Sequence, residues 1–300
     1  SKNAGRMHAC GHDGHMACLC GAAKVLAQHR DDLRATVKLI FQPGEELAGG
    51  ARCMVEQGVM EDVDAVFGLH GWPGLAVGKV GVRSGTIMAC ARFFRITIEG
   101  KGCHGADPAV GIDPIVAAAH VITALQTVAS RELDPAESCV VTIGRFAAGT
   151  TGNIIPDAAV LEGTIRALTV DSAEVVMRAV ERIARDVCGA CRAAATVAFG
   201  EHAYPPVVND PVMTDFARDT LSTVLGPDSV AEIDRPSMTA EDFAFYLHKA
   251  PGAFLWLGLA PAGVHRAIPL HNARFDFNDE AIPPGIHLLT ALALRFPPAR

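Results

Sequence analysis

The sequence contains no apolar stretch long enough to cross a membrane, because Gly, Pro or a charged residue interrupts each of its longest apolar runs. Its first residues are polar and rich in metal-binding side chains, unlike a secretory signal peptide. It also has no internal repeat and no low-complexity tract. We therefore expect a soluble protein that has no membrane partner.

Basic clusters and disulfide spacing are missing as well. The formal net charge is -7 and Lys and Arg are scattered, so the chain has no basic stripe for nucleic acid. The cysteines number nine, which is odd, and they lack the spacing of a disulfide framework. We expect reduced thiols and a cytoplasmic location.

Half of the 300 residues are apolar, which is enough for a large core in one or two domains. Ser1 is not a translation start, and a chemically rich motif follows it almost at once. We expect the native protein to have a further N-terminal segment.

Metal-seeking side chains crowd into one short stretch near the start, at His8, Cys10, His12, Asp13 and His15. In an extended backbone His8, Cys10 and His12 would share one face, and Gly11 would let the chain approach an ion. Thiolate and imidazole ligands favour Zn, Mn, Co or Ni over calcium and magnesium. The motif predicts one wall of a metal site.

Other interpretations of these cysteines stay open at this point. A structural zinc site would show two close ligand pairs, but Cys18/Cys20 and Cys188/Cys191 have no histidines around them. A thiol redox role for Cys188 and Cys191 would require an exposed thiol of low pKa. Cys10 could also be a catalytic nucleophile, although that would leave the carboxylates described next unexplained.

Strand and helix patterns alternate between residues 35 and 70. A strand at 35–42 precedes Glu45 and Glu46, a helix ends near Gly58, and a strand at 63–69 runs directly into His70. Without a hairpin turn these strands should pair in parallel, and functional groups gather at the carboxyl ends of parallel strands. The two glutamates and His70 occupy such positions.

The pattern changes between residues 91 and 204. Strands are expected at 92–99, 138–146, 158–167 and 193–199, and helices at 113–130 and 172–187. This βαββαβ order is that of a ferredoxin-like domain. After hinges at 81–91 and 204–209, helices at 211 onward, 239–249 and 284–296 and a strand at 253–259 should rejoin the first sheet. We predict an α/β catalytic domain with a mostly parallel sheet at 1–90 and 205–300, interrupted by an inserted α+β domain at 91–204.

Two further histidines complete a possible ligand set. His70 ends a buried strand and His271 lies in a loop before the last helix. With Cys10, His12 and one glutamate they supply enough ligands for two ions that share a water, which then attacks a carbonyl while a carboxylate moves its proton.

The order of motifs over the whole chain resembles the M20 metallopeptidase family, in the branch of hippurate hydrolase, N-acyl-amino-acid amidohydrolases and auxin-conjugate hydrolases. The segments that carry this resemblance are His8-Ala-Cys-Gly-His-Asp-Gly-His15, Phe41-Gln-Pro-Gly-Glu-Glu46, Gly68-Leu-His70, Gly102-Cys-His-Gly105, Ser237-Met-Thr-Ala-Glu-Asp-Phe-Ala-Phe-Tyr246, and Leu270-His271 with Phe275-Asp-Phe-Asn-Asp279.

The resemblance implies roles for particular residues. The metal ligands would be Cys10, His12, Glu46, His70 and His271. Glu45 would be the general base, and His104 would stabilise the oxyanion in a neighbouring active site. Asn153 and Arg166 would hold the substrate carboxylate. The inserted domain would act as a lid and mediate a homodimer.

The chain departs from the family pattern at two places. The opening quarter of the family is absent, and Pro108-Ala109 stands where relatives often have a His after the Pro. His8, Asp13 and His15 are expected to orient ligands rather than bind metal. The remaining histidines are expected on surfaces or helices, at His29, His120, His202, His248, His265 and His287.

We therefore predict an amidohydrolase that uses two divalent ions, Mn or Zn first and Co or Ni next, to cleave the amide of small N-acyl amino acids. The alternative is a catalytically inactive truncated homologue that keeps metal binding and dimerises through the inserted domain.

Overall fold

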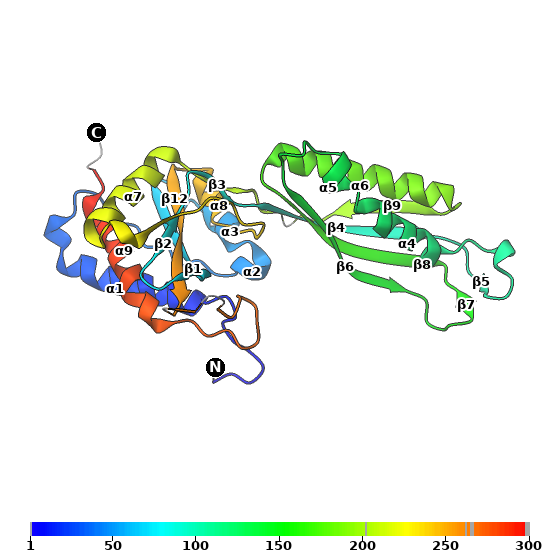
Figure 1. Cartoon of the computed structure of the whole chain (residues 1–300), viewed down its shortest axis with the longest axis horizontal. Helices are drawn as coiled ribbons and strands as arrows, with labels where there is room; N and C mark the ends of the chain where they lie inside the picture. The colour runs from blue at the N-terminus through cyan, green and yellow to red at the C-terminus, as the bar shows by residue number, and fades with distance from the viewer. Residues whose placement is uncertain (1, 202, 262, 265–266, 298–300) are drawn as a thin grey trace. The chain divides into compact units, whose positions relative to one another are not determined.

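The computed structural model describes residues 2–201, 203–261, 263–264 and 267–297. The chain separates into two compact units (Figure 1). The first unit contains Ser1–Ile87, Val208–Arg235 and Phe245–Arg300, and the second contains Met88–Val207 and Pro236–Ala244. The short stretch 236–244 thus belongs with the second unit, whereas the sequence analysis placed it in the catalytic domain. Among the described residues, no helix is both long and apolar enough to cross a membrane.

A four-stranded mixed sheet forms the centre of the first unit. Its order is β1-β12-β2-β11, with bounds Val66–Ala76, Gly252–Ala260, Val80–Val82 and Val230–Glu232. The pairs β1·β12 and β2·β11 are parallel, and β2·β12 is antiparallel. Every residue of β12 is buried, as expected of an apolar strand inside a covered sheet. The short strands β3 (Gly85–Met88) and β10 (Val207–Asn209) pair with each other.

Three helices contribute most of the apolar packing in the first unit: α1 (His12–Gln28), α7 (Pro211–Val224) and α9 (Ile282–Arg295). Cys18 and Leu288 join Leu255 and Leu257 in one core cluster. Helices α1 and α9 approach closely, because a Cβ on Gly285 would lie 2.5 Å from Cys18 Sγ. Three further helices are short: α2 (Glu45–Ala48), α3 (Gly50–Glu56) and α8 (Ala244–Leu247).

Three sequence predictions for the segments expected in the catalytic domain need correction. The segment 35–42 is not a strand in the structure, because a strand requires a hydrogen-bonded neighbour and none pairs with this segment among the described residues. Strand β1 continues to Ala76, so His70 lies within the strand rather than after it. The helix expected at 239–249 shrinks to α8, because the carbonyls of Ser237 and Thr239 accept from Ala89 N–H and hold that stretch extended.

The second unit has the predicted order of long elements, β4-α4-β6-β8-α6-β9. Their bounds are Cys90–Glu99, Pro114–Leu125, Cys139–Ala148, Ala158–Ala167, Val170–Ala190 and Ala194–Phe199, and α5 (Val128–Arg131) follows α4. The sheet order is β6-β8-β4-β9, and all neighbours are antiparallel. One face packs Ile96, Leu161 and Ile165 against Val121 and Val180 of the helices.

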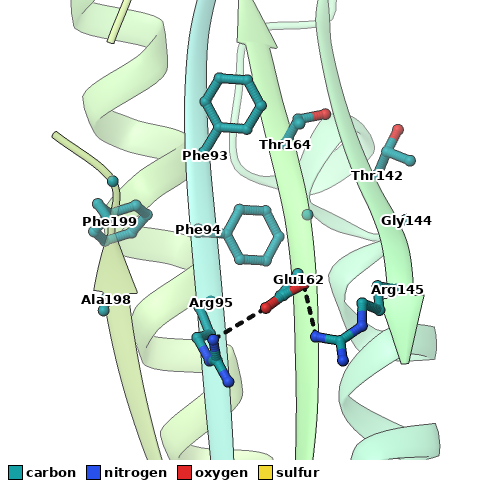
Figure 2. Close-up of a pocket in the computed structure, with 12 residues that line it drawn as sticks. Phe93, Phe94, Arg95, Thr142, Gly144, Arg145, Glu162, Thr164, Ala198 and Phe199 are labelled. Carbon is teal, nitrogen blue, oxygen red and sulfur yellow. Dashed lines mark hydrogen bonds and ion pairs between the residues drawn. The ribbon is translucent and has the colours of Figure 1, made fainter. Parts of the chain in front are cut away.

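The opposite face of this sheet is open and forms a shallow hollow (Figure 2). Phe93 lies opposite Thr164, and Thr142 lies on the other side of Thr164, while Arg95 and Arg145 both pair with Glu162, at 3.1 and 3.0 Å. Exposed ion pairs of this kind contribute less than about 1 kcal/mol each. None of the predicted site residues lines the hollow, so it is a solvated sheet face and not the centre of the chemistry.

Candidate metal centre

The metal motif forms a turn followed by a helix. Gly11 has a φ of 80°, in the left-handed region, and a Cβ there would lie 2.8 Å from the Phe277 ring. Only glycine fits both conditions. Helix α1 then begins at His12. The extended alternation expected for this segment is therefore wrong: the turn brings Cys10 and His12 together, while His8 is exposed and lies outside the donor groups of the described residues.

Four separate segments of the first unit bring their donor atoms together. In overlapping groups, these atoms lie within 4.8 Å of one another, and the side chains are Cys10, His12, Glu45, Glu46, His70 and His271. Cys10 and His70 are buried, His12 and Glu45 are half-buried, and Glu46 and His271 are exposed. All six were predicted from the sequence, so the structure gathers the five expected ligands and the expected base in one place.

The distances between donors suit shared ions. Cys10 Sγ lies 3.4 Å from His70 Nε2, and Glu46 Oε1 lies 3.5 Å from His271 Nε2 and 4.0 Å from His12 Nε2. Ligands about 2.0 to 2.3 Å from one tetrahedral ion are roughly 3.3 to 3.8 Å from each other. The donor set and its spacing therefore fit borderline transition metals, with Glu46 placed between two histidines.

Burial favours the neutral form of two histidines of this cluster, His70 and His12. Desolvation lowers the pKa of His70 to about 4, against the effect of its hydrogen bond with the Gly71 carbonyl. Desolvation also lowers the pKa of His12, although the nearby Glu46 carboxylate opposes it. Neutral imidazole is the form that binds metal, so both side chains are ready to act as ligands at neutral pH.

The neighbouring glutamates stand on a short helical turn. Helix α2 begins at Glu45, and the glycines on either side of it, Gly44 and Gly49, have φ values of 69° and 61°. These left-handed residues let the chain reverse sharply at both ends of α2. Glu46 lies within reach of two histidines, and a carboxylate oxygen of Glu45 lies within 4.8 Å of the donor atoms of His12 and Glu46.

His271 is held in an uncommon backbone conformation. Its φ is 63°, which is rare for a residue other than glycine, and its N–H donates to the Ala9 carbonyl at 2.8 Å. That hydrogen bond ties the loop of His271 to the residue before Cys10. Strained backbone of this kind concentrates at functional sites, where the surrounding structure maintains it.

His104 and Asn153 lie together in the second unit. Strand β5 (Cys103–His104) pairs with β7 (Ile154–Ile155), and Gly105 N–H donates to the Asn153 carbonyl at 2.8 Å. The Ala106 N–H donates to His104 Nδ1 at 3.1 Å, which leaves the proton of a neutral ring on Nε2. The Thr151 hydroxyl lies 3.0 Å from Asn153 Oδ1, so the amide nitrogen is the group that Asn153 can offer to an anion.

Arg166 does not join them. It lies near the end of β8, opposite Ala91 and Val140 on the neighbouring strands. Strand β8 begins at Ala158, close to β7, and eight residues of strand extend over about 26 Å. In a single subunit, Arg166 therefore lies at the end of the four-stranded sheet that is far from the β5·β7 pair, where His104 and Asn153 lie.

The sequence analysis gave His15 only a general orienting role, and the structure gives it a definite partner. Gly71 N–H donates to His15 Nε2 at 2.8 Å, and the ring lies 4.5 Å from that of His70. Two buried carboxylates of the second unit, Glu241 and Asp242, were not singled out either. Their position within an expected helix concealed them, although full burial of Asp or Glu is rare without a partner.

The buried thiols of Cys188 and Cys18 lack the properties of a thiol redox site. Cys188 is buried in α6, and burial raises the pKa of its thiol to about 11. Cys18 lies in the core of the first unit, where burial likewise raises its pKa to about 11. A reactive thiol needs the opposite shift. His202 and His265 lie outside the described residues.

Comparison with known proteins covers nearly the whole chain. Residues 1–295 match peptidase family M20/M25/M40. The chain is 41% identical over 299 residues to IAA-amino acid hydrolase ILR1-like 4 of Arabidopsis thaliana, with 99% of this chain and 68% of that protein covered. It is 38% identical over 296 residues to N-acetyl-L-cysteine deacetylase of Bacillus subtilis (strain 168), covering 98% and 69%. A solved dinuclear metal-binding peptidase of the M20 family from Bacillus subtilis shares 36% identity at a TM-score of 0.81, covering 98% and 74%.

Proposed function

The chain belongs to peptidase family M20/M25/M40, as its motifs indicated, and we propose that it is an amidohydrolase that cleaves N-acyl amino acids into a carboxylate and a free amino acid. The observation that carries this proposal is the cluster of Cys10, His12, Glu46, His70 and His271 in the first unit, with Glu45 beside it. We propose that it holds two divalent ions, with Mn or Zn first and Co or Ni next. When bound, such ions would supply Lewis-acid activation of a water and of the substrate carbonyl.

Glu45 is the residue we assign as general base. It would take a proton from the attacking water while the new C–O bond forms, and give that proton to the amide nitrogen as the C–N bond breaks. Glu46 is assigned as a ligand, because its Oε1 is within 4.0 Å of two histidines. Glu45 lies beside this ligand, with a carboxylate oxygen within 4.8 Å of the donor atoms of His12 and Glu46.

His104 and Asn153 are the groups we assign to the substrate. The hydrogen bond from Ala106 to His104 Nδ1 supports a donor role for His104 Nε2–H, which would stabilise the developing oxyanion. The Asn153 amide nitrogen would contact the substrate carboxylate. Arg166 would do the same with its guanidinium fork.

The second unit of a single subunit cannot bring His104, Asn153 and Arg166 to the same substrate. An N-acyl amino acid spans about two residues of chain, or about 7 Å, whereas Arg166 lies about 26 Å of strand from the β7 end of the sheet. We therefore propose a homodimer in which the second unit acts as a lid and dimerisation domain. His104 and Asn153 would then serve the metal centre of the partner subunit.

The substrate class that we propose rests on the activities for which two relatives are named. One relative is an IAA-amino acid hydrolase and another an N-acetyl-L-cysteine deacetylase, and both substrates join an acyl group to an amino acid through an amide. We propose the same class here, including hippurate-like N-benzoyl amino acids. Because Cys10 must be reduced to bind metal, we further propose that the protein works in the cytoplasm.

The test is a hydrolysis assay on purified protein loaded with Mn²⁺ or Zn²⁺. N-acetyl and N-benzoyl amino acids should release a free amine, and Glu46→Gln should lose both bound metal and amine release. Wild-type protein that binds metal but releases no amine from either series would instead support the inactive homologue, which keeps metal binding and dimerisation only.

A further inference from the structure

His15 lies inside the metal motif but outside every donor group of the described residues. Its ring contacts two others, since its centroid lies 4.5 Å from that of His70 and 5.4 Å from that of His12. Its Nε2 accepts the N–H of Gly71, at 2.8 Å, and this hydrogen bond joins residues that are 56 positions apart. This hydrogen bond thus connects helix α1 to the residue that follows the expected ligand His70.

The two hydrogen bonds at Gly71 fix the proton of each histidine. A backbone N–H can only donate, so His15 Nε2 is the unprotonated nitrogen of its ring. A carbonyl can only accept, so His70 Nδ1, at 2.9 Å from Gly71 O, carries the proton of its ring. His70 Nε2 therefore keeps its lone pair on the side of Cys10 Sγ, 3.4 Å away.

Among the residues that the structure describes, β1 is an end strand of its sheet, so its outward-facing N–H groups have no neighbouring strand to bind. It pairs with β12 on one side, and Gly71 directs its N–H toward His15 instead of toward a strand. Gly71 is buried, and an unpaired backbone N–H in a buried position is costly. His15 thus completes the hydrogen bonding of the strand at the residue next to the ligand His70.

The surroundings of His15 fix its ring. Phe277 lies against it, with ring centroids 6.1 Å apart. The same phenylalanine fills the space left by glycines, because a Cβ on Gly14 or Gly71 would lie 2.5 or 3.0 Å from its ring. His15 is therefore held between His70 and Phe277, with little freedom to turn.

We propose that His15 is a positioning residue for the metal centre: by accepting the Gly71 N–H it fixes the end strand at His70 and aims His70 Nε2 at the ion beside Cys10. The inference rests on the proposed metal site, but it assigns to His15 a role as hydrogen-bond acceptor and not as ligand. The proton of the neutral His15 ring must then be on Nδ1.

The experiment compares three substitutions by titration with Zn²⁺ alone against a competing chelator. His15→Leu removes the acceptor and should weaken zinc binding about 10- to 100-fold. His15→Gln places a carbonyl oxygen near the position of Nε2 and should stay close to wild type. His15→Asn has an acceptor that is too short to reach Gly71 and should behave like His15→Leu. Equal affinity of wild type and His15→Leu, or equal losses in the Leu and Gln variants, would overturn the proposal.

Amide hydrogen exchange in metal-free protein separates this role from general structural damage. In His15→Leu the Gly71 amide should exchange about tenfold faster or more, while amides of the second unit keep their rates. If that variant does not fold, ¹⁵N spectra of the wild-type histidines decide, because a His15 ring protonated on Nε2 contradicts the proposal. A wild-type protein that takes up no zinc would refute the proposed metal site, and a fast-exchanging wild-type Gly71 would refute the role of His15 alone.

Discussion

His70 in the first unit is 5% exposed and hydrogen-bonded to its own strand, whereas His104 in the second unit is exposed on a strand of two residues. The two histidines thus lie in different environments. Burial keeps His70 neutral and packed in place, which suits a ligand that is already positioned before an ion binds. Exposure leaves His104 accessible, which suits a donor that must meet a substrate arriving from solution. The difference suggests that the first unit holds metal and the second recognises substrate.

The sharpest test of this division lies within the first unit, at the adjacent glutamates. Glu45→Gln should keep its metal and lose about 10²- to 10⁴-fold in kcat, because the amide cannot take a proton from water. Glu46→Gln should lose metal, because an amide oxygen is a poorer ligand than a carboxylate. Metal content by mass spectrometry and turnover on the same samples distinguish the two. Equal metal loss in both variants would show that the assigned roles are wrong.

In the second unit, the substitution His104→Ala tests the proposed oxyanion donor. It should leave metal content unchanged and lower turnover about 10²- to 10³-fold, the range for loss of one oxyanion donor. Mixing it with Glu45→Gln protein gives a matched test of the dimer. If His104 acts on the partner's metal centre, mixed dimers should recover one working site from two inactive parents. Verified subunit exchange with no recovery would confine His104 to its own subunit.

The sequence predicted the second unit more closely than the first, and the reason is physical. Its long strands alternate buried and exposed residues, and Val170–Ala190 has one apolar face, so local pattern determines each element. The segment 35–42 of the first unit has the right composition for a strand, and the stretch 239–249, which runs from the second unit into the first, has the right composition for a helix. Pairing partners decide their structure, and partners are distant in the sequence.

The candidate site was predictable as a set of residue types and less so as a geometry. Cys10, His12, His70, His271 and one glutamate could be chosen because thiol, imidazole and carboxylate in this pattern are chemically unusual, and only the family resemblance selected Glu46 over Glu45. The left-handed φ of His271 and the contact of His15 with Gly71 could not be predicted, because both depend on how remote segments meet. The residue types determine which chemistry the site can perform, and the tertiary contacts determine how its side chains are oriented.

Acidification should destabilise the first unit selectively. Burial lowers the pKa of His70 from 6.5 to about 4, so between these pH values the unfolded state binds more protons than the folded state. The stabilising effect is complete above pH 6.5 and is lost as the pH falls toward 4, and it is on the order of 3 kcal/mol. The pKa of His12 and that of His15 are also lowered, which adds to the loss in the same direction.

Tryptophan fluorescence can report this change for the first unit alone. The chain has two tryptophans, Trp72 and Trp256, and their rings stack in the first unit at 3.8 Å. In metal-free protein the urea midpoint followed by fluorescence should fall between pH 7 and pH 5. Amide signals from β8 serve as the control in the second unit, where His104 is exposed. An unchanged fluorescence midpoint would mean that burial of His70 does not limit stability.

The smallest expected effects come from one substitution made in each unit. Gly14 lies in α1, and a Cβ there would be 2.5 Å from three atoms of the Phe277 ring, so Gly14→Ala should cost about 1 to 3 kcal/mol. Gly189 lies in α6 with nothing within 4 Å of an added Cβ, so Gly189→Ala should stabilise that helix by about 0.5 to 1 kcal/mol. Urea unfolding followed by circular dichroism measures both changes. Opposite signs are required, because a methyl group competes with Phe277 at Gly14, whereas at Gly189 it only restricts the unfolded chain. If Gly14→Ala is neutral, Phe277 can move without cost, and the ring cannot be what holds His15 beside His70.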